Sequence, residues 1–128
     1  MINGIDHIVL RVMDLARATA HWENVFGLVA DRVVENPQLG IKQAFLPLPE
    51  GAFVELIAPL SEESPLNGVL RKRGEGVHLV SFRVNDAAAA IENWKANGAE
   101  VHEVTNGPAF VLPKSANGTM IGAAGADT

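Results

Sequence analysis

The sequence predicts an α+β protein built from two copies of a βαβββ module, and three observations lead to this. A twelve-residue segment, RVMDLARATAHW, recurs 72 residues later as RVNDAAAAIENW, keeping Arg11, Val12, Asp14 and Trp22. Each copy follows an alternating, β-branched run, which is typical of a strand. A glycine closes each copy, as expected where a helix ends. Two such modules predict a curled mixed sheet with the helices outside.

Composition places the chain among acidic globular proteins of one domain. It has 128 residues, 48% of them hydrophobic, a net charge of −5 and no cysteine. The negative charge argues against nucleic-acid binding, because a phosphate backbone needs cationic partners. The absence of cysteine excludes disulfides, thiolate metal sites and thiol nucleophiles. With no long apolar run and no basic leader segment, we expect a cytoplasmic protein without a membrane span.

The two modules are expected at about 1–60 and 75–128, joined by a short helical linker within a single domain. Asp14 and Asp86 are the expected helix N-caps, and Gly27 and Gly98 are expected to follow the helix ends. The predicted elements are strand 5–12, helix 15–26, strands 28–35, 41–46 and 52–58, a short helix 65–73 with Pro65 in its first turn, strand 77–84, helix 87–97, and strands near 100–104, 109–112 and 119–123.

Strand alternation assigns side chains to two faces. The run Ile8, Leu10 and Val12 is apolar and predicts a face covered by a helix. If the two sheets join edge to edge, the opposite faces line an open cup. The expected lining residues are His7, Arg11, Glu55, Ser81 and Arg83, among Phe45, Phe53, Ile57, Leu79, Phe110 and Met120.

These residues also carry a family resemblance. The segments IDHIVLRV and GVHLVSFRV, with FVELIAPL and FVLPKSANG, resemble the vicinal-oxygen-chelate superfamily, which includes glyoxalase I, extradiol dioxygenases and bleomycin-resistance proteins. Within it, the chain is most similar to methylmalonyl-CoA epimerases. The resemblance implies an isomerase, epimerase or lyase that acts by proton transfer on a small carbonyl compound or an acyl-CoA-type substrate. It also implies a homodimer, for which residues 41–45 would leave an apolar sheet edge to cover.

The family's divalent metal is held by four side chains, and this chain matches only half of them. The resemblance assigns two ligands to His7 and Glu55, whereas Leu79 and Gly122 stand at the other two positions. Gln43 stands where some epimerases have a proton-transfer glutamate. We therefore expect no tightly bound metal, because a catalytic site needs about three protein ligands.

Strand alternation argues against His78 as a replacement for the missing ligand. It is in register with Val80 and Phe82 on the helix-covered face, and moving it inward would need a slip that turns the whole strand over. We expect a partly buried histidine that is hydrogen-bonded to the backbone.

Two interpretations of the remaining polar residues stay open. In one, Glu55 or His7 accepts a proton inside an apolar cup, and Arg11 or Arg83 neutralises an anionic group of the substrate. In the other, Glu55 forms a weak ion pair with one of these arginines, and His7 has no role. The candidate substrate-binding residues are Arg11, Gln43, Phe53, Leu79, Ser81, Arg83, Phe110 and Met120.

A second function class also remains. The lost metal ligands favour a binding module that sequesters a hydrophobic small molecule, as bleomycin-resistance proteins of this superfamily do. The retained His7 and Glu55 favour the enzyme.

Overall fold

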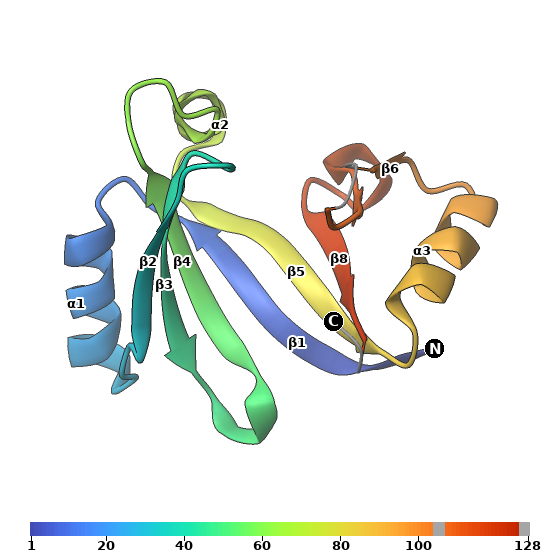
Figure 1. The fold of residues 1–128 in the computed structure, drawn as a ribbon, viewed down its shortest axis with the longest axis horizontal. Helices are drawn as coiled ribbons and strands as arrows, with labels where there is room; N and C mark the ends of the chain where they lie inside the picture. Colours follow the sequence, from blue (N-terminus) through green and yellow to red (C-terminus); the bar gives the residue numbers. More distant parts are fainter. Residues whose placement is uncertain (104–106, 126–128) are drawn as a thin grey trace. The chain divides into compact units, whose positions relative to one another are not determined.

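The structure is a computed structural model that describes residues 1–103 and 107–125 and divides into two compact units (Figure 1). We call Val9–Val77 the central unit. The terminal unit combines Met1–Ile8 with the described part of His78–Thr128. The terminal unit is therefore assembled from both ends of the sequence.

Within the described residues, strands and helices alternate in the order β-α-β-β-β on both sides of helix α2. The first set is β1 (Ile2–Arg11), α1 (Leu15–Phe26), β2 (Arg32–Asn36), β3 (Ile41–Pro47) and β4 (Phe53–Pro59). Then come α2 (Leu66–Arg73), β5 (Gly76–Val84), α3 (Ala87–Ala96), β6 (Val101–His102), β7 (Phe110–Val111) and β8 (Met120–Ala124). Short 3-10 turns, Pro49–Gly51 and Pro113–Ser115, precede β4 and β8.

The strands form a mixed, open sheet. In the central unit the strand order is β2-β3-β4-β1, and in the terminal unit it is β1-β5-β8-β7-β6, so β1 is common to both. The pairs β2–β3, β3–β4, β6–β7 and β7–β8 are antiparallel, whereas β5 and β8 run parallel. The α+β class and the mixed sheet predicted from the repeat are confirmed. The single-domain organisation stays a prediction.

Alternation along β3 and β4 builds the core of the central unit. Ala44, Leu46 and Leu56 are completely buried, and helix α1 contributes Leu15 to the same cluster. Trp22 and Leu10 pack against this cluster from α1 and β1. The helix therefore covers the face that the sequence predicted, and Trp22 serves as a core residue.

Both long helices begin at the predicted aspartates. The Asp14 carboxylate accepts a hydrogen bond from the Arg17 N–H at 3.1 Å, and Asp86 accepts one from the Ala89 N–H at 3.0 Å. These caps satisfy backbone donors that the first turn of a helix leaves without partners. Gly27 ends α1 in the left-handed conformation, with φ of 75°.

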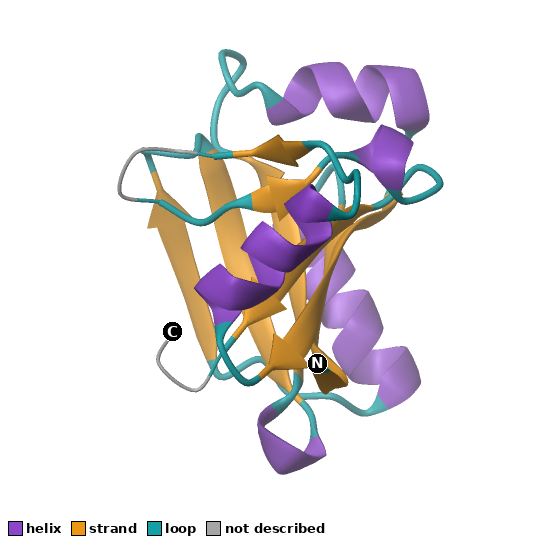
Figure 2. Cartoon of the chain, turned by 90° about the vertical axis from the view of Figure 1, so that its right-hand side faces the viewer, coloured by secondary structure: helices purple, strands orange, loops and turns teal. Residues whose placement is uncertain are grey.

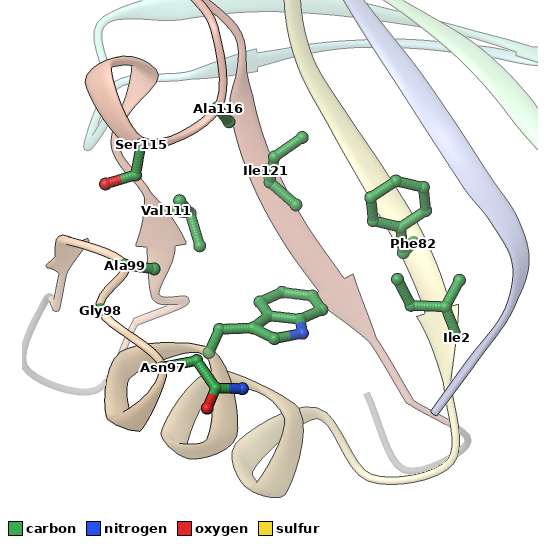
Figure 3. Close-up of a pocket in the computed structure, with 10 residues that line it drawn as sticks. Ile2, Phe82, Asn97, Gly98, Ala99, Val111, Ser115, Ala116 and Ile121 are labelled. Atoms are coloured by element: carbon green, nitrogen blue, oxygen red, sulfur yellow. The ribbon is translucent and has the colours of Figure 1, made fainter.

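The central unit has an open pocket beside helix α1, and the terminal unit has one beside helix α3. Figure 2 views this side of the molecule, with α3 in front of the strands. A cavity of about 450 Å³ is lined by side chains from both, including Phe82, Trp94, Val111 and Ile121 (Figure 3). Helix α3 begins with four alanines where α1 has Leu15, Ala16, Arg17 and Ala18, and β6 and β7 are only two residues long. The pocket of the central unit, about 620 Å³, is likewise lined by helix and strand residues, including Leu15, Thr19, Val33 and Ala58.

Several boundaries differ from the predicted ones. The predicted strand 28–35 begins only at Arg32, because the Glu23 carboxylate accepts from the Ala30 N–H at 2.9 Å and holds the preceding residues in a connection. Helix α2 begins after Pro65, which is its N-cap. The strand predicted near 100–104 is confined to Val101–His102 in the described part of the chain, and Val104 lies outside the described residues.

The prediction of an exposed sheet edge at residues 41–45 is wrong. These residues belong to β3, which pairs with β2 on one side and β4 on the other. Five residues of β2 are enough to cover the full length of that edge from Ile41 to Phe45. The outermost strand of the central unit is therefore β2.

The difference in burial between Leu46 and Ile121 predicts unequal costs for the same kind of truncation. Leu46→Ala should lower the free energy of unfolding by about 4 kcal/mol, because it opens a void in a filled core. Ile121→Ala should cost about 2 kcal/mol, because its side chain is only partly buried. Urea denaturation of both variants measures the two values, and an equal cost would contradict the expected effect of burial.

Candidate functional site

A buried carboxylate lies on the face of the central sheet opposite helix α1. Glu55 of β4 is only 9% exposed, and one of its oxygens accepts a hydrogen bond from Gln43 Nε2 at 2.9 Å. The Gln43 Oε1 atom lies 3.5 Å from Asn36 Nδ2 on β2. Asn36 in turn accepts from the Leu39 N–H, which fixes the direction of its amide. The three side chains therefore form a chain of contacts that ends at the carboxylate.

Aromatic rings flank Glu55 on this face. Phe45 of β3 lies directly opposite Glu55 in the strand register, and its ring centre is 5.8 Å from that of Phe53. On the other side of Phe45, the guanidinium of Arg32 stacks over the ring at 4.1 Å from its centre. A polar group, two rings and a cation thus share one face of three adjacent strands.

Arg11 has a structural role in the central unit. Its Nε donates to the Gly74 carbonyl at 2.7 Å, and its Nη1 donates to the Val77 carbonyl at 2.8 Å. Burial, and then the nearby positive charge of Arg73, lower the pKa of this guanidinium from its ordinary value. Arg11 therefore ties the end of β1 to the segment between α2 and β5.

The terminal unit holds the second candidate proton carrier. His7 Nδ1 lies 2.8 Å from the carboxylate of Asp6, which orients the imidazole ring. Arg83 Nε lies 4.0 Å from the other oxygen of the same carboxylate. Asp6 therefore connects His7 and Arg83 within one unit.

The residues of the terminal unit do not fit the family's metal site. Leu79 and Met120 are direct partners in the β5–β8 register, as are Ser81 and Gly122. A Cβ at position 122 would lie 3.3 Å from Ser81 Oγ and 3.6 Å from both Leu79 Cδ2 and Phe110 Cδ1. The two positions expected to supply ligands thus form an apolar surface beside a hydroxyl group. Over residues 1–103 and 107–125, no three His, Asp or Glu side chains are grouped as a metal would require.

The sequence-predicted site residues fall into two groups. The central unit brings Gln43, Phe45, Phe53 and Glu55 to one face, and the terminal unit brings Leu79, Ser81, Phe110 and Gly122 together. His7 and Arg83 gather around Asp6. Because the two groups belong to different units, their combination in one site remains a prediction, and so do the roles of their members.

Sequence reasoning missed three polar residues next to these groups. They are Asp6, Arg32 and Asn36. The signal for Asp6 was its position next to His7. Arg32 required the β2–β3 register, which pairs it with Phe45 and which no local pattern reveals.

Comparison with known proteins identifies the family. Residues 6–110 match the model of the Glyoxalase/Bleomycin resistance protein/Dioxygenase superfamily. The chain belongs to this superfamily. The resemblance inferred from the repeated segments is therefore confirmed.

The relatives of this superfamily member include epimerases and lyases. The chain is 34% identical over 102 residues to the ethylmalonyl-CoA/methylmalonyl-CoA epimerase of Cereibacter sphaeroides, covering 79% of this chain and 75% of that protein. It is 34% identical over 98 residues to the lactoylglutathione lyase of Salmonella typhimurium, covering 74% and 68%. A variant of the Streptomyces coelicolor methylmalonyl-CoA epimerase, solved with 2-nitronate-propionyl-CoA, superposes with a TM-score of 0.81 at 25% identity, covering 98% of this chain and 100% of that one.

The structural role of Arg11 is testable by stability. Arg11→Met keeps much of the apolar stem but leaves the Gly74 and Val77 carbonyls without their donor, so the free energy of unfolding should fall by about 2 kcal/mol. Arg71→Met is the matched control, since Arg71 is exposed at the end of α2 and its loss should cost less than about 0.5 kcal/mol. Equal stability of the two variants in urea titrations would refute this role.

Proposed function

We propose that this protein is an epimerase or lyase that moves a proton at the carbon next to a carbonyl group, in a small carbonyl compound or an acyl-CoA-type thioester. The observation that carries the proposal is the buried Glu55 carboxylate, held by Gln43 and bordered by aromatic rings. Burial of a carboxylate lowers the stability of the fold, and such costly ionisable groups cluster at functional sites. The epimerase and lyase relatives support the same chemistry.

In this proposal Glu55 accepts the proton from the substrate carbon, and the electron pair left behind moves onto the carbonyl oxygen. The Gln43 amide holds the carboxylate in one orientation, which lowers the entropic cost of the transfer. An arginine or another hydrogen-bond donor stabilises the negative oxygen. Returning a proton to the same carbon from its opposite face gives the epimer.

His7 is the proposed donor of that second proton. The contact between Nδ1 and Asp6 orients the ring, and we assign the transfer to this imidazole. Arg83, beside the same aspartate, is the proposed contact for an anionic group of the substrate.

We further propose that the reaction requires no tightly bound metal. What supports this is the ligand set: the two positions expected to hold ligands are Leu79 and Gly122, which offer no donor side chain. Two remaining ligands fall short of the three that a catalytic metal ion normally needs.

A second candidate function is the binding of a hydrophobic small molecule without turnover. The observation that favours it is the apolar surface formed by Leu79 and Phe110 around Gly122. In that case the Glu55 carboxylate is a polar group of the binding site and accepts no proton from the ligand.

A homodimer in the cytoplasm is also proposed. Val33 and Leu39 leave apolar side chains exposed on and beyond the outermost strand β2, which supports association with a second copy. The acidic, cysteine-free composition supports the location. In the described part of the chain, no helix is both long and apolar enough to span a bilayer.

Removal of divalent ions should leave the protein's activity unchanged. After dialysis against a chelator, the rate of proton exchange should stay within about twofold of the untreated rate, because two of four family ligands are missing. Elemental analysis of the purified protein should find well under one divalent ion per chain. Loss of exchange with chelator and its recovery with added cobalt or zinc would contradict the proposal.

The role of Glu55 is tested by Glu55→Gln, which keeps the size of the side chain and removes the proton acceptor. Exchange of the substrate's α-proton in deuterated water, followed by NMR with methylmalonyl-CoA, should fall by at least about 10²-fold. Affinity for the same compound, measured by calorimetry, should change only a few-fold.

Gly122→Leu separates the two candidate functions. A pure binding module should keep its ligand affinity in Glu55→Gln but lose it in Gly122→Leu, which fills the space between Ser81 and Phe110. An enzyme of the proposed kind loses proton exchange in Glu55→Gln. Undiminished exchange in that variant would remove Glu55 from the mechanism.

A further inference from the structure

We propose that the Ser81 hydroxyl donates a hydrogen bond to the carbonyl oxygen of a bound acyl thioester, in a recess of the terminal unit that Gly122 leaves open. This inference rests on the proposed function, which makes the ligand a carbonyl compound and requires a hydrogen-bond donor for its oxygen. It assigns that donor to one side chain of β5. Two features support it: a buried hydroxyl without a protein partner, and the missing side chain on the neighbouring strand β8.

The Ser81 side chain is buried, yet its hydroxyl has no hydrogen-bond partner among the protein groups of residues 1–103 and 107–125. The residue is only 4% exposed. The three other buried polar or charged residues in these ranges, Arg11, Glu55 and Ser64, each have a partner. Buried polar groups normally are hydrogen-bonded, and one without a partner lowers the stability of the fold. The Ser81 hydroxyl is therefore a candidate contact for a polar atom of a ligand.

This hydroxyl remains within reach of a ligand. In the part of the chain that the structure describes, every side-chain nitrogen or oxygen atom that is sealed from solvent has a hydrogen-bond partner. Because Ser81 Oγ has none, it is not sealed and keeps a small opening to the surface. A single polar atom of a ligand can therefore approach it.

Gly122 provides the space beside the hydroxyl. It is the direct partner of Ser81 in the parallel pairing of β5 and β8. A methyl group in the place of its missing side chain would lie 3.3 Å from Ser81 Oγ and 3.6 Å from both Leu79 Cδ2 and Phe110 Cδ1. An oxygen atom in that place needs to move by only about 0.5 Å to reach the usual hydrogen-bond distance between two oxygens, about 2.8 Å. The recess thus has room for one carbonyl oxygen next to its donor.

The surroundings of the recess favour a neutral oxygen over a charged one. Apart from Ser81 Oγ, the atoms nearest to the missing side chain are carbons of Leu79 and Phe110. The Nε atom of Arg83 lies 4.0 Å from Asp6 of β1, and β1 flanks β5 on the side away from β8. A carboxylate in the recess would lose its water without gaining a cation, which is costly. A carbonyl oxygen is satisfied by the one hydrogen bond that Ser81 offers.

The test is equilibrium binding, measured by calorimetry, of two probes that differ only at the carbonyl group. Acetyl-CoA has the carbonyl oxygen, and S-ethyl-CoA has a methylene group in place of the carbonyl. The native protein should bind acetyl-CoA about fivefold more tightly, as expected for one hydrogen bond between neutral groups. In Ser81→Ala this preference should disappear, because binding of acetyl-CoA becomes weaker while the affinity for S-ethyl-CoA stays within about twofold.

Ser64→Ala is the matched control, because it removes an equally buried hydroxyl that serves the fold. Ser64 is 5% exposed, and its Oγ accepts a hydrogen bond from the Leu66 N–H at 3.2 Å. This variant should unfold at a lower urea concentration than the native protein and leave both affinities unchanged. Ser81→Ala should unfold at the native urea concentration or above it, because no protein group uses its hydroxyl. A lower midpoint for Ser81→Ala than for Ser64→Ala would assign Ser81 to the fold and overturn the proposal.

Gly122→Ala adds a second criterion, because it fills the recess and keeps the hydroxyl. It should weaken acetyl-CoA binding at least as much as Ser81→Ala does. Undiminished binding in Gly122→Ala, or equal loss of both probes in Ser81→Ala, would overturn the assignment. A native protein that does not prefer acetyl-CoA would overturn it as well.

These binding measurements also separate this inference from the proposed function, because they need no turnover. If Glu55→Gln keeps proton exchange while Ser81→Ala loses the preference for acetyl-CoA, the proposed base is wrong and the carbonyl contact stands. If Glu55→Gln abolishes exchange while Ser81→Ala keeps the preference, the carbonyl contact alone is rejected.

Discussion

The alternation of side chains along β3 and β4 is the constraint on which the rest of the central unit depends. One parity places Ala44, Leu46 and Leu56 under helix α1, where they are completely buried. The other parity then has to place Gln43, Phe45 and Glu55 on the opposite face. A shift of one residue would exchange the two sets and bury the polar ones against the helix. The stability of the core therefore also fixes the orientation of the candidate site.

The two copies of the module differ in the residues of their helices and in the residues on the polar face of their strands. In the first copy, Leu15 and Trp22 of helix α1 pack against long strands in the layer behind the site. In the second copy, helix α3 begins with four alanines, and its Trp94 lines an open pocket between the helix and the strands. The same copy has also replaced two expected ligand positions by Leu79 and Gly122. Both its core and its polar face have thus diverged from those of the first copy.

Local patterns predicted much of this protein, and the remainder depended on pairing between strands. The caps at Asp14 and Asp86, helix α1 from Leu15 to Phe26 and the α+β class follow from short-range chemistry that the sequence displays directly. The contacts of Arg32 and of Asn36 depend on which residue of β3 faces them. The bonds from Arg11 to Gly74 and Val77 join residues more than sixty positions apart. No periodicity within a window of the sequence contains that information.

These bonds of Arg11 have a topological consequence. The chain enters the central unit at Val9 and leaves it at Val77, and Arg11 connects the strand of entry to the residue of exit. The central unit is therefore a segment inserted into the sequence of the terminal unit. The Arg11 guanidinium holds the two ends of this segment together. An insertion with adjoining ends can be lengthened, exchanged or circularly permuted without rerouting the surrounding chain. The architecture thus allows one half of a duplicated protein to change its chemistry while the other half keeps its fold.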